Sequence, residues 1–197
     1  PGRQPPVVVD QSGAPQGARH CVFLDPDQSP ATAAIDLLRA ALARKLRPIV
    51  YCRSRRMTEL VSLWAGSLSG PWAGRISAYR AGFLPEERRQ IEARMASGEL
   101  LAVVSTSALE LGIDIGGLDV CILVGYPGTL LSTLQRGGRV GRAQQESAVV
   151  LVAGEDALDQ YFMSHPEDFF SRPAEKAVVN PWNEVILARH LECAAAE

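Results

Sequence analysis

The 197-residue chain is long enough for one large domain with an appended segment, because single cores usually span roughly 100 to 200 residues. Its composition, 47% hydrophobic and 21% charged, is that of an ordinary globular protein, and no apolar run approaches the roughly 20 residues that a membrane-spanning helix needs. The net charge of -2 excludes nucleic-acid binding through overall basicity, so a local patch would have to provide it.

The N-terminus and the cysteines favour a cytoplasmic protein without metal ligands. Residues 1–6 contain one Arg and no apolar core, so they do not resemble a secretory signal. Cys21, Cys52, Cys121 and Cys193 are widely spaced and form no C-x-x-C pair, which argues against a zinc site or a disulfide framework within this chain. We therefore expect four buried thiols, a cytoplasmic location and no membrane contact.

Short β-branched apolar runs alternate with amphipathic stretches from Cys21 to Ala153, which is typical of βαβ units around a parallel sheet. Several runs are apolar on both faces, as buried parallel strands must be. The sequence therefore predicts an α/β fold with a mostly parallel central sheet between layers of helices. The expected strands are 20–24, 48–52, 75–79, 101–105, 119–125 and 147–153, and the expected helices are 31–47, 54–67, 84–96 and 130–140.

The two ends of the chain depart from this pattern. Residues 1–19 are rich in Pro, Gly and Gln, which predicts a linker or an edge segment before the α/β domain at 20–155. Residues 156–197 are expected to form a mainly helical extension that leads to a missing downstream region. Within it we expect a helix at 156–165, a break at 169–173 and a further helix starting at 181.

The strongest local signal is Gln135–Arg142, with the sequence QRGGRVGR. Arginines three positions apart share one face of a helix, and their planar guanidinium groups suit bidentate binding of phosphate. Two such groups would neutralise the charge that develops on a transferred phosphoryl group. The alternative is a solvated basic helix end, which glycine-flanked arginines would favour if the segment stood alone.

A second signal, Ser105–Ile115, follows a buried strand. Ligands of open α/β sheets collect at the carboxyl ends of strands, where the hydroxyls of Ser105 and Thr106 would hold a phosphodiester. Asp114, two residues after Gly112, would accept from a ribose hydroxyl or from a facing arginine. The alternative is that these side chains only cap the next helix and turn.

Arginines also follow two other expected strands. Arg53, with Ser54 beside it, and Arg80 would grip the phosphate backbone of a nucleic acid strand without reading its sequence. Catalysis by Cys52 is the rival hypothesis for the first of these segments. A phosphatase-like loop would need Arg where Thr58 stands, so we interpret Cys52 as structural.

Because all these segments follow successive strands, a doubly wound sheet would gather them on one edge. In this combination the sequence resembles the second, RecA-like motor lobe of superfamily 2 helicases over residues 20–153. Residues 51–55 resemble motif IV, 79–83 the segment after it, 105–115 motif V and 135–142 motif VI, and the last match is highly specific. The resemblance implies a three-layer α/β/α domain.

Three further segments resemble a narrower group, the bacterial DNA-repair helicases of the mitomycin repair factor A type. They are residues 108–119, the turn at 125–128 and residues 180–184. Members of that group carry a cysteine-rich zinc region after the motor, and Cys193 stands where such a region would begin. The resemblance thus implies zinc in a downstream region that is not present here.

The resemblance also implies a role for each candidate residue. Arg139 and Arg142 would act across a cleft on the γ-phosphate of ATP, and Gln135 would help to set closure of that cleft. Gly112 and Asp114 would contact the nucleotide. The contacts to the backbone of single-stranded or tailed DNA would come from Arg53, Ser54, Arg80, Ser105 and Thr106.

The chain carries neither a G-x-x-x-x-G-K-[ST] loop nor a D-E-x-[DH] tract, the groups that hold phosphates and Mg²⁺ in such motors. We therefore expect the C-terminal lobe of an ATP-dependent DNA helicase, inactive alone, with ATP and Mg²⁺ held mainly by an N-terminal RecA-like lobe. The alternatives are an RNA helicase lobe and a non-catalytic nucleic-acid-binding or regulatory module of the same fold, since no base-reading residue is identifiable.

Overall fold

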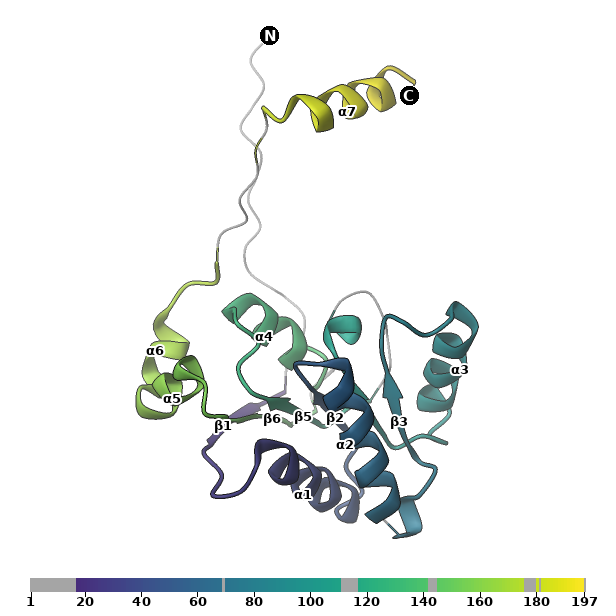
Figure 1. The fold of residues 1–197 in the computed structure, drawn as a ribbon, viewed down its shortest axis with the longest axis vertical. Helices are drawn as coiled ribbons and strands as arrows, with labels where there is room; N and C mark the ends of the chain where they lie inside the picture. Colours follow the sequence, from purple (N-terminus) through teal and green to yellow (C-terminus); the bar gives the residue numbers. More distant parts are fainter. Residues whose placement is uncertain are drawn as a thin grey trace.

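A six-stranded sheet forms the centre of the molecule, in the order β1-β6-β5-β2-β4-β3, and every strand pair is parallel (Figure 1). The computed structural model describes residues 17–68, 70–110, 117–141, 145–175, 180 and 182–196. Each predicted strand is confirmed to within one residue at either end. The strands are β1 (Arg19–Leu24), β2 (Pro48–Tyr51), β3 (Ile76–Tyr79), β4 (Ala102–Ser105), β5 (Val120–Val124) and β6 (Ser147–Val152).

Alternation along the strands sends side chains into two separate cores. In β2, Ile49 and Tyr51 pack into one core, whereas Val50 packs into the other. The same alternation separates Cys121 from Ile122 in β5. Because both faces are covered, these strands carry apolar residues at successive positions instead of alternating with polar ones.

Helices cover both faces of the sheet, so the domain has three layers (Figure 1). The helices α1 (Pro30–Ala43) and α2 (Arg55–Leu68) pack on one face. The other face carries α3 (Pro85–Ala96), α4 (Leu130–Gly137), α5 (Ala157–Ser164) and α6 (Pro166–Ser171). Two short 3-10 turns, η1 (Gly70–Trp72) and η2 (Ser107–Leu109), and the helix α7 (Glu184–Ala196) complete the described elements.

Two predicted helices end earlier than expected. Helix α1 stops at Ala43, because the chain turns through Lys45, whose φ of 61° lies in the left-handed region. Helix α4 stops at Gly137, and Gly138 is its C-cap. Arg139 therefore lies beyond the helix, and the prediction that it shares a helical face with another arginine is wrong.

The first two helices of the C-terminal extension are part of the core. Phe162 of α5 and Phe169 of α6 are 2% and 9% exposed, and their ring centroids lie 5.6 Å apart. The ring of Phe162 also lies 4.8 Å from that of Tyr126. The predicted break at 169–173 is wrong for its first residues, since α6 continues to Ser171. In contrast, α7 has no buried residue.

In the described part of the chain, no helix is both long enough and apolar enough to cross a membrane. No group of three or more His, Cys, Asp or Glu side chains in that part is placed to hold a metal ion.

Replacing Phe162 with alanine should lower the free energy of unfolding by about 3–5 kcal/mol, because truncating a buried aromatic side chain leaves a cavity. Replacing Phe170, which is 61% exposed, should have a much smaller effect. Urea unfolding followed by circular dichroism measures both. Unfolding of the Phe162 variant at the wild-type midpoint would show that α5 does not share the core.

Candidate nucleotide and nucleic-acid site

A cleft of about 360 Å³ opens at the carboxyl ends of β2, β4, β5 and β6. The strands are parallel, so the segments that follow them meet at this edge of the sheet. The predicted gathering of segments is confirmed for Arg53 and Thr106, and Arg136 of α4 joins them. The lining consists of Cys52, Arg53, Thr106, Ser107, Tyr126, Pro127, Gly128, Arg136, Asp156 and Leu158.

Arg53 is held in this cleft by other parts of the chain. Its Nη2 donates to Asp159 Oδ1 at 2.7 Å and to the Tyr126 carbonyl oxygen at 3.0 Å. Its Nη1 lies 3.4 Å from Asp156 Oδ2. Gly125 has a φ of +82°, and a Cβ there would come within 2.5 Å of Arg53 Nε. Glycine at this position therefore lets the arginine cross the end of β5.

Asp159 is a fully buried carboxylate in the first turn of α5. Besides Arg53, it accepts the backbone N–H groups of Tyr126 and Gly154, each at 2.8 Å. Three donors, one of them charged, offset the desolvation of the carboxylate. This one side chain therefore ties the loops after β5 and β6 to the segment after β2.

A second ion pair joins two of the motif-like segments. Glu110 Oε2 accepts from Arg136 Nε at 2.9 Å, and the two side chains are only 13% and 10% exposed. Glu110 Oε1 accepts from Ser132 Oγ at 2.8 Å. The Arg136 guanidinium lies 5.3 Å from the centroid of the Tyr51 ring. These contacts fix α4 to the segment after β4.

Arg139, in the turn after α4, binds the same segment. Its Nε and Nη2 donate to the Glu110 carbonyl oxygen at 3.2 and 2.7 Å. The segments that resemble motifs V and VI are therefore in direct contact. Gln135 lies half-buried on α4. The predicted residues Gly112, Asp114 and Arg142 lie outside the described residues, so their roles stay predictions.

The predicted hydroxyl contacts have different surroundings. Ser105 Oγ is buried and donates to the Tyr79 carbonyl oxygen at 3.0 Å. Ser54 Oγ accepts the Met57 N–H at 3.1 Å, so this hydroxyl is engaged at the start of α2. Thr106 is half-buried, lines the cleft and makes no side-chain cap bond to η2. Of the three, Thr106 is the one that lines the cleft, and neither Ser105 nor Thr106 caps the following turn through its side chain.

Arg80 lies further along the same edge, after the outer strand β3. Its Nε donates to Glu59 Oε1 at 2.6 Å, and its guanidinium carbon lies 4.8 Å from the centroid of the Phe83 ring. Arg80 is not among the residues that line the cleft. The prediction that the segments gather on one edge of the sheet therefore holds for Arg80, although Arg80 lies outside the cleft.

The extension braces the helix that leads to the arginine segment. Glu175 accepts the backbone N–H groups of Leu130 and Leu131 at 2.7 and 2.9 Å, at the N-terminus of α4. These bonds from the Leu131 and Leu130 amides hold the pKa of Glu175 below its ordinary value. A carboxylate at this end of a helix is also favoured by the helix dipole.

Cys52 lines the cleft but is a poor nucleophile. Burial raises the pKa of the Cys52 and Cys121 thiols to about 12, so both are protonated at neutral pH. Cys21 and Cys193 are exposed, so the expectation of four buried thiols is wrong for these two. The reason is that β1 is an edge strand and α7 buries none of its side chains.

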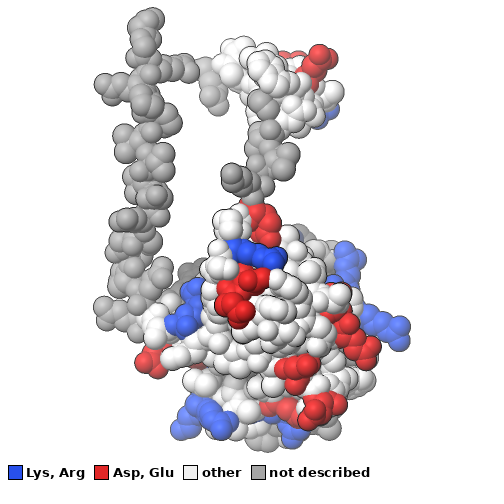
Figure 2. Space-filling view, turned by 90° about the vertical axis from the view of Figure 1, so that its left-hand side faces the viewer, with Lys and Arg blue, Asp and Glu red and all other residues white. Residues whose placement is uncertain are grey.

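Charges of both signs are mixed on the face that carries α5 and α6. Figure 2 shows acidic and basic side chains interspersed there instead of one broad basic field. The net charge of -2 agrees with this distribution. On this face, contacts to a nucleic acid backbone would therefore have to come from individual arginines and not from a broad basic surface.

Three carboxylates of this site, those of Asp159, Glu110 and Glu175, were not predicted from the sequence. Asp156 and Asp159 carry only the ordinary signal of a helix start, an N-cap acid followed by an acid in the first turn. The sequence separations from Asp159 to Tyr126 and to Arg53 are 33 and 106 residues. A local sequence pattern therefore cannot predict that Asp159 is buried and bonded to these distant residues.

The domain has a parallel sheet between two layers of helices, and the turn that carries Arg139 is hydrogen-bonded to Glu110 in the segment after β4. Together these features define a RecA-like domain of the helicase class. Residues 30–144 match the family described as helicase conserved C-terminal domain, and the chain belongs to that family. The predicted family is therefore confirmed.

Two curated relatives extend the likeness along nearly the whole chain. The chain is 43% identical over 205 residues to the uncharacterized ATP-dependent helicase YprA of Bacillus subtilis, which covers 98% of the chain and 27% of YprA. It is 35% identical over 206 residues to the ATP-dependent helicase hrq1 of Schizosaccharomyces pombe, which covers 96% of the chain and 19% of hrq1. The chain thus spans less than a third of the length of either relative.

Solved structures give the same result. The DUF1998 helicase MrfA bound to DNA superposes with a TM-score of 0.86 at 41% identity, over 94% of this chain and 28% of MrfA. Mycobacterium smegmatis Lhr bound to ssDNA and AMP-PNP gives a TM-score of 0.75 at 27% identity, over 99% and 27% of the two chains. The predicted RecA-like fold and the resemblance to the bacterial repair-helicase group are confirmed.

Replacing Glu110 with glutamine should lower the free energy of unfolding by about 3 kcal/mol, because removing one partner of a largely buried ion pair leaves the other charge uncompensated. The matched control is Glu86→Gln, which breaks an exposed pair with Arg89 and should cost less than about 1 kcal/mol. Urea unfolding measures both. Equal losses in the two variants would contradict a structural role for the Glu110 pair.

Native protein at pH 8 should react with a thiol-specific reagent at Cys193 and, more slowly, at Cys21, whose pKa is raised by partial burial. Cys52 and Cys121 should stay unmodified until urea is added, because their buried thiols form little thiolate at this pH. Mass spectrometry after timed labelling identifies the sites. Fast native labelling of Cys52 would overturn its structural interpretation.

Proposed function

We propose that this chain is the C-terminal motor lobe of an ATP-dependent superfamily 2 DNA helicase, and that the helicase acts in the cytoplasm in DNA repair. The observation that carries the proposal is the direct contact of the Arg139 turn with the Glu110 segment, beside the arginine-lined cleft. In this role the lobe supplies arginine fingers and single-strand backbone contacts for translocation and unwinding.

For the nucleotide, we propose that Arg139 and Arg142 contact the γ-phosphate and that Gln135 couples this contact to closure of the two lobes. Gly112 and Asp114 would touch the nucleotide. The bidentate geometry of guanidinium groups suits phosphate oxygens, which supports Arg139 in this role. Arg139 is half-buried and already oriented by the Glu110 carbonyl oxygen, so little ordering is needed when phosphate binds.

The partner lobe follows from what the chain lacks. With no P-loop in its 197 residues, the chain alone should not hydrolyse ATP, so ATP and Mg²⁺ would be held mainly by an N-terminal RecA-like lobe. The helicase relatives are several times longer than this chain, which supports such a two-lobe arrangement. Zinc would belong to a further, downstream region.

For DNA, we propose that a single strand passes along the carboxyl edge of the sheet. Thr106 and Arg53 line the cleft there, and Arg80 extends the same edge. Ser54 and Ser105 would contribute through the backbone geometry of their loops, since their hydroxyls are engaged within the protein. The structures of MrfA bound to DNA and of Lhr bound to ssDNA support a DNA substrate.

The proposal is tested by single-strand-stimulated ATPase activity of the full-length protein. Changing both Arg139 and Arg142 to alanine should lower the turnover rate at least about 100-fold, as loss of arginine fingers predicts. Arg89→Ala, which removes an exposed arginine on α3, is the matched control and should keep the wild-type rate. This chain by itself should show no activity.

Equal rates in the wild type and the double variant would remove the arginine-finger assignment and favour a non-catalytic binding module. Stimulation by single-stranded RNA and not by DNA would instead make this an RNA helicase lobe.

A further inference from the structure

Two side chains of opposite charge meet at the surface of the cleft. Arg53 and Asp156 both line it, their side chains are 43% and 46% exposed, and Arg53 Nη1 lies 3.4 Å from Asp156 Oδ2. A phosphate that approached the exposed side of the guanidinium would therefore also approach the Asp156 carboxylate. Like charges at such distances repel each other.

The positive charge of Arg53 is already balanced from the buried side. Asp159 is 0% exposed, lies 2.7 Å from Arg53 Nη2 and accepts two backbone N–H groups as well. Arg136, the other arginine of the lining, is balanced in the same way by Glu110. The two arginines that line the cleft are thus already paired with Asp159 and Glu110. Asp156 adds a negative charge that neither arginine needs for neutralisation.

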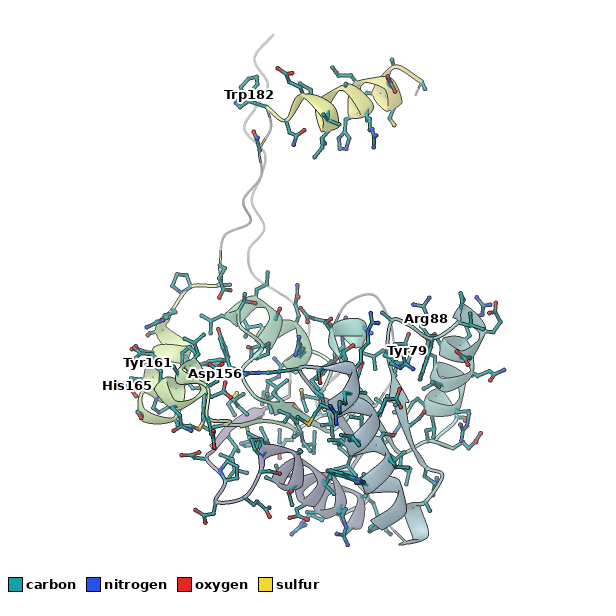
Figure 3. All side chains as sticks on the ribbon, in the orientation of Figure 1. Tyr79, Arg88, Asp156, Tyr161, His165 and Trp182 are labelled. Atoms are coloured by element: carbon teal, nitrogen blue, oxygen red, sulfur yellow. The ribbon has the colours of Figure 1, made fainter. Side chains whose placement is uncertain are left out.

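Asp156 does not depend on Arg53 for its position. It is the N-cap of α5, and its Oδ1 accepts the Leu158 N–H at 3.0 Å while Oδ2 faces Arg53. Figure 3 shows Asp156 at the start of α5. The helix thus fixes the carboxylate in the cleft whether or not a ligand is bound there.

We propose that Asp156 limits the affinity of the cleft for the backbone of single-stranded DNA by competing with a phosphate for Nη1 of Arg53. Asp159 is the positioning residue that holds the same guanidinium through Nη2. The inference rests on the proposed function. A motor that steps along a strand must release each phosphate again, and a built-in competing anion keeps this contact weak.

The test is Asp156→Asn in the full-length protein, with affinity for fluorescent oligo(dT) measured by anisotropy at several salt concentrations. Asparagine keeps the oxygen that caps α5 and removes only the charge. At low salt the Kd should fall about fivefold, the factor that corresponds to two unit charges about 4 Å apart in water. The dependence of log K on log salt should steepen by about 0.7. A variant that merely lost stability would not gain affinity.

Two controls make the result specific. Glu86→Gln makes the same change of charge beside the exposed Arg89 on α3 and should leave the Kd unchanged. Introduced together with Arg53→Gln, the Asp156→Asn change should no longer increase affinity, because the gain acts through Arg53.

The inference is overturned by an unchanged or weaker Kd for Asp156→Asn, by an equal gain for Glu86→Gln, or by a gain that persists without Arg53. Failure of the proposed function is separate, because it would appear in the unmodified protein as absence of DNA-stimulated ATPase activity.

Discussion

Burial of a parallel sheet on both faces is the constraint on which the rest of the structure depends. A polar group placed inside β2, β4 or β5 would lose its hydration, so charged side chains are confined to the strand ends. Because the strands are parallel, their carboxyl ends coincide at one edge. The cleft between Arg53, Thr106 and Arg136 is thus a consequence of topology as well as of the motifs themselves.

Two ion pairs then give this edge a fixed shape. Arg53 with Asp159, and Arg136 with Glu110, each join segments that lie far apart in the sequence. In both pairs the carboxylate is nearly or fully buried, so separating the partners would leave an uncompensated charge in a poorly hydrated place. The loops around the cleft are therefore held in position before a ligand arrives, which reduces the ordering needed for binding.

The strands were predictable because burial on both faces leaves continuous β-branched runs, and the arginine-bearing segments could be placed after them. The end of α4 could not be predicted in the same way. Val140 fits the helical spacing, but it reaches the core from the turn beyond Gly138. The carboxylates Glu110 and Asp159 were also missed, because their importance comes from partners brought together by the fold. A local sequence pattern cannot distinguish a buried carboxylate with several distant partners from an ordinary acidic residue on a helix.

The two carboxylates beside Arg53 have different physical consequences because their exposure differs. Asp159 is shielded from solvent, so its attraction for Arg53 is little screened by salt and contributes to the stability of the fold. Asp156 is 46% exposed, so its interaction weakens with ionic strength and contributes little to stability. The buried Asp159 therefore holds Arg53 in place, whereas the exposed Asp156 changes how strongly Arg53 binds a phosphate. The stability of the fold and the affinity of the cleft can thus vary independently.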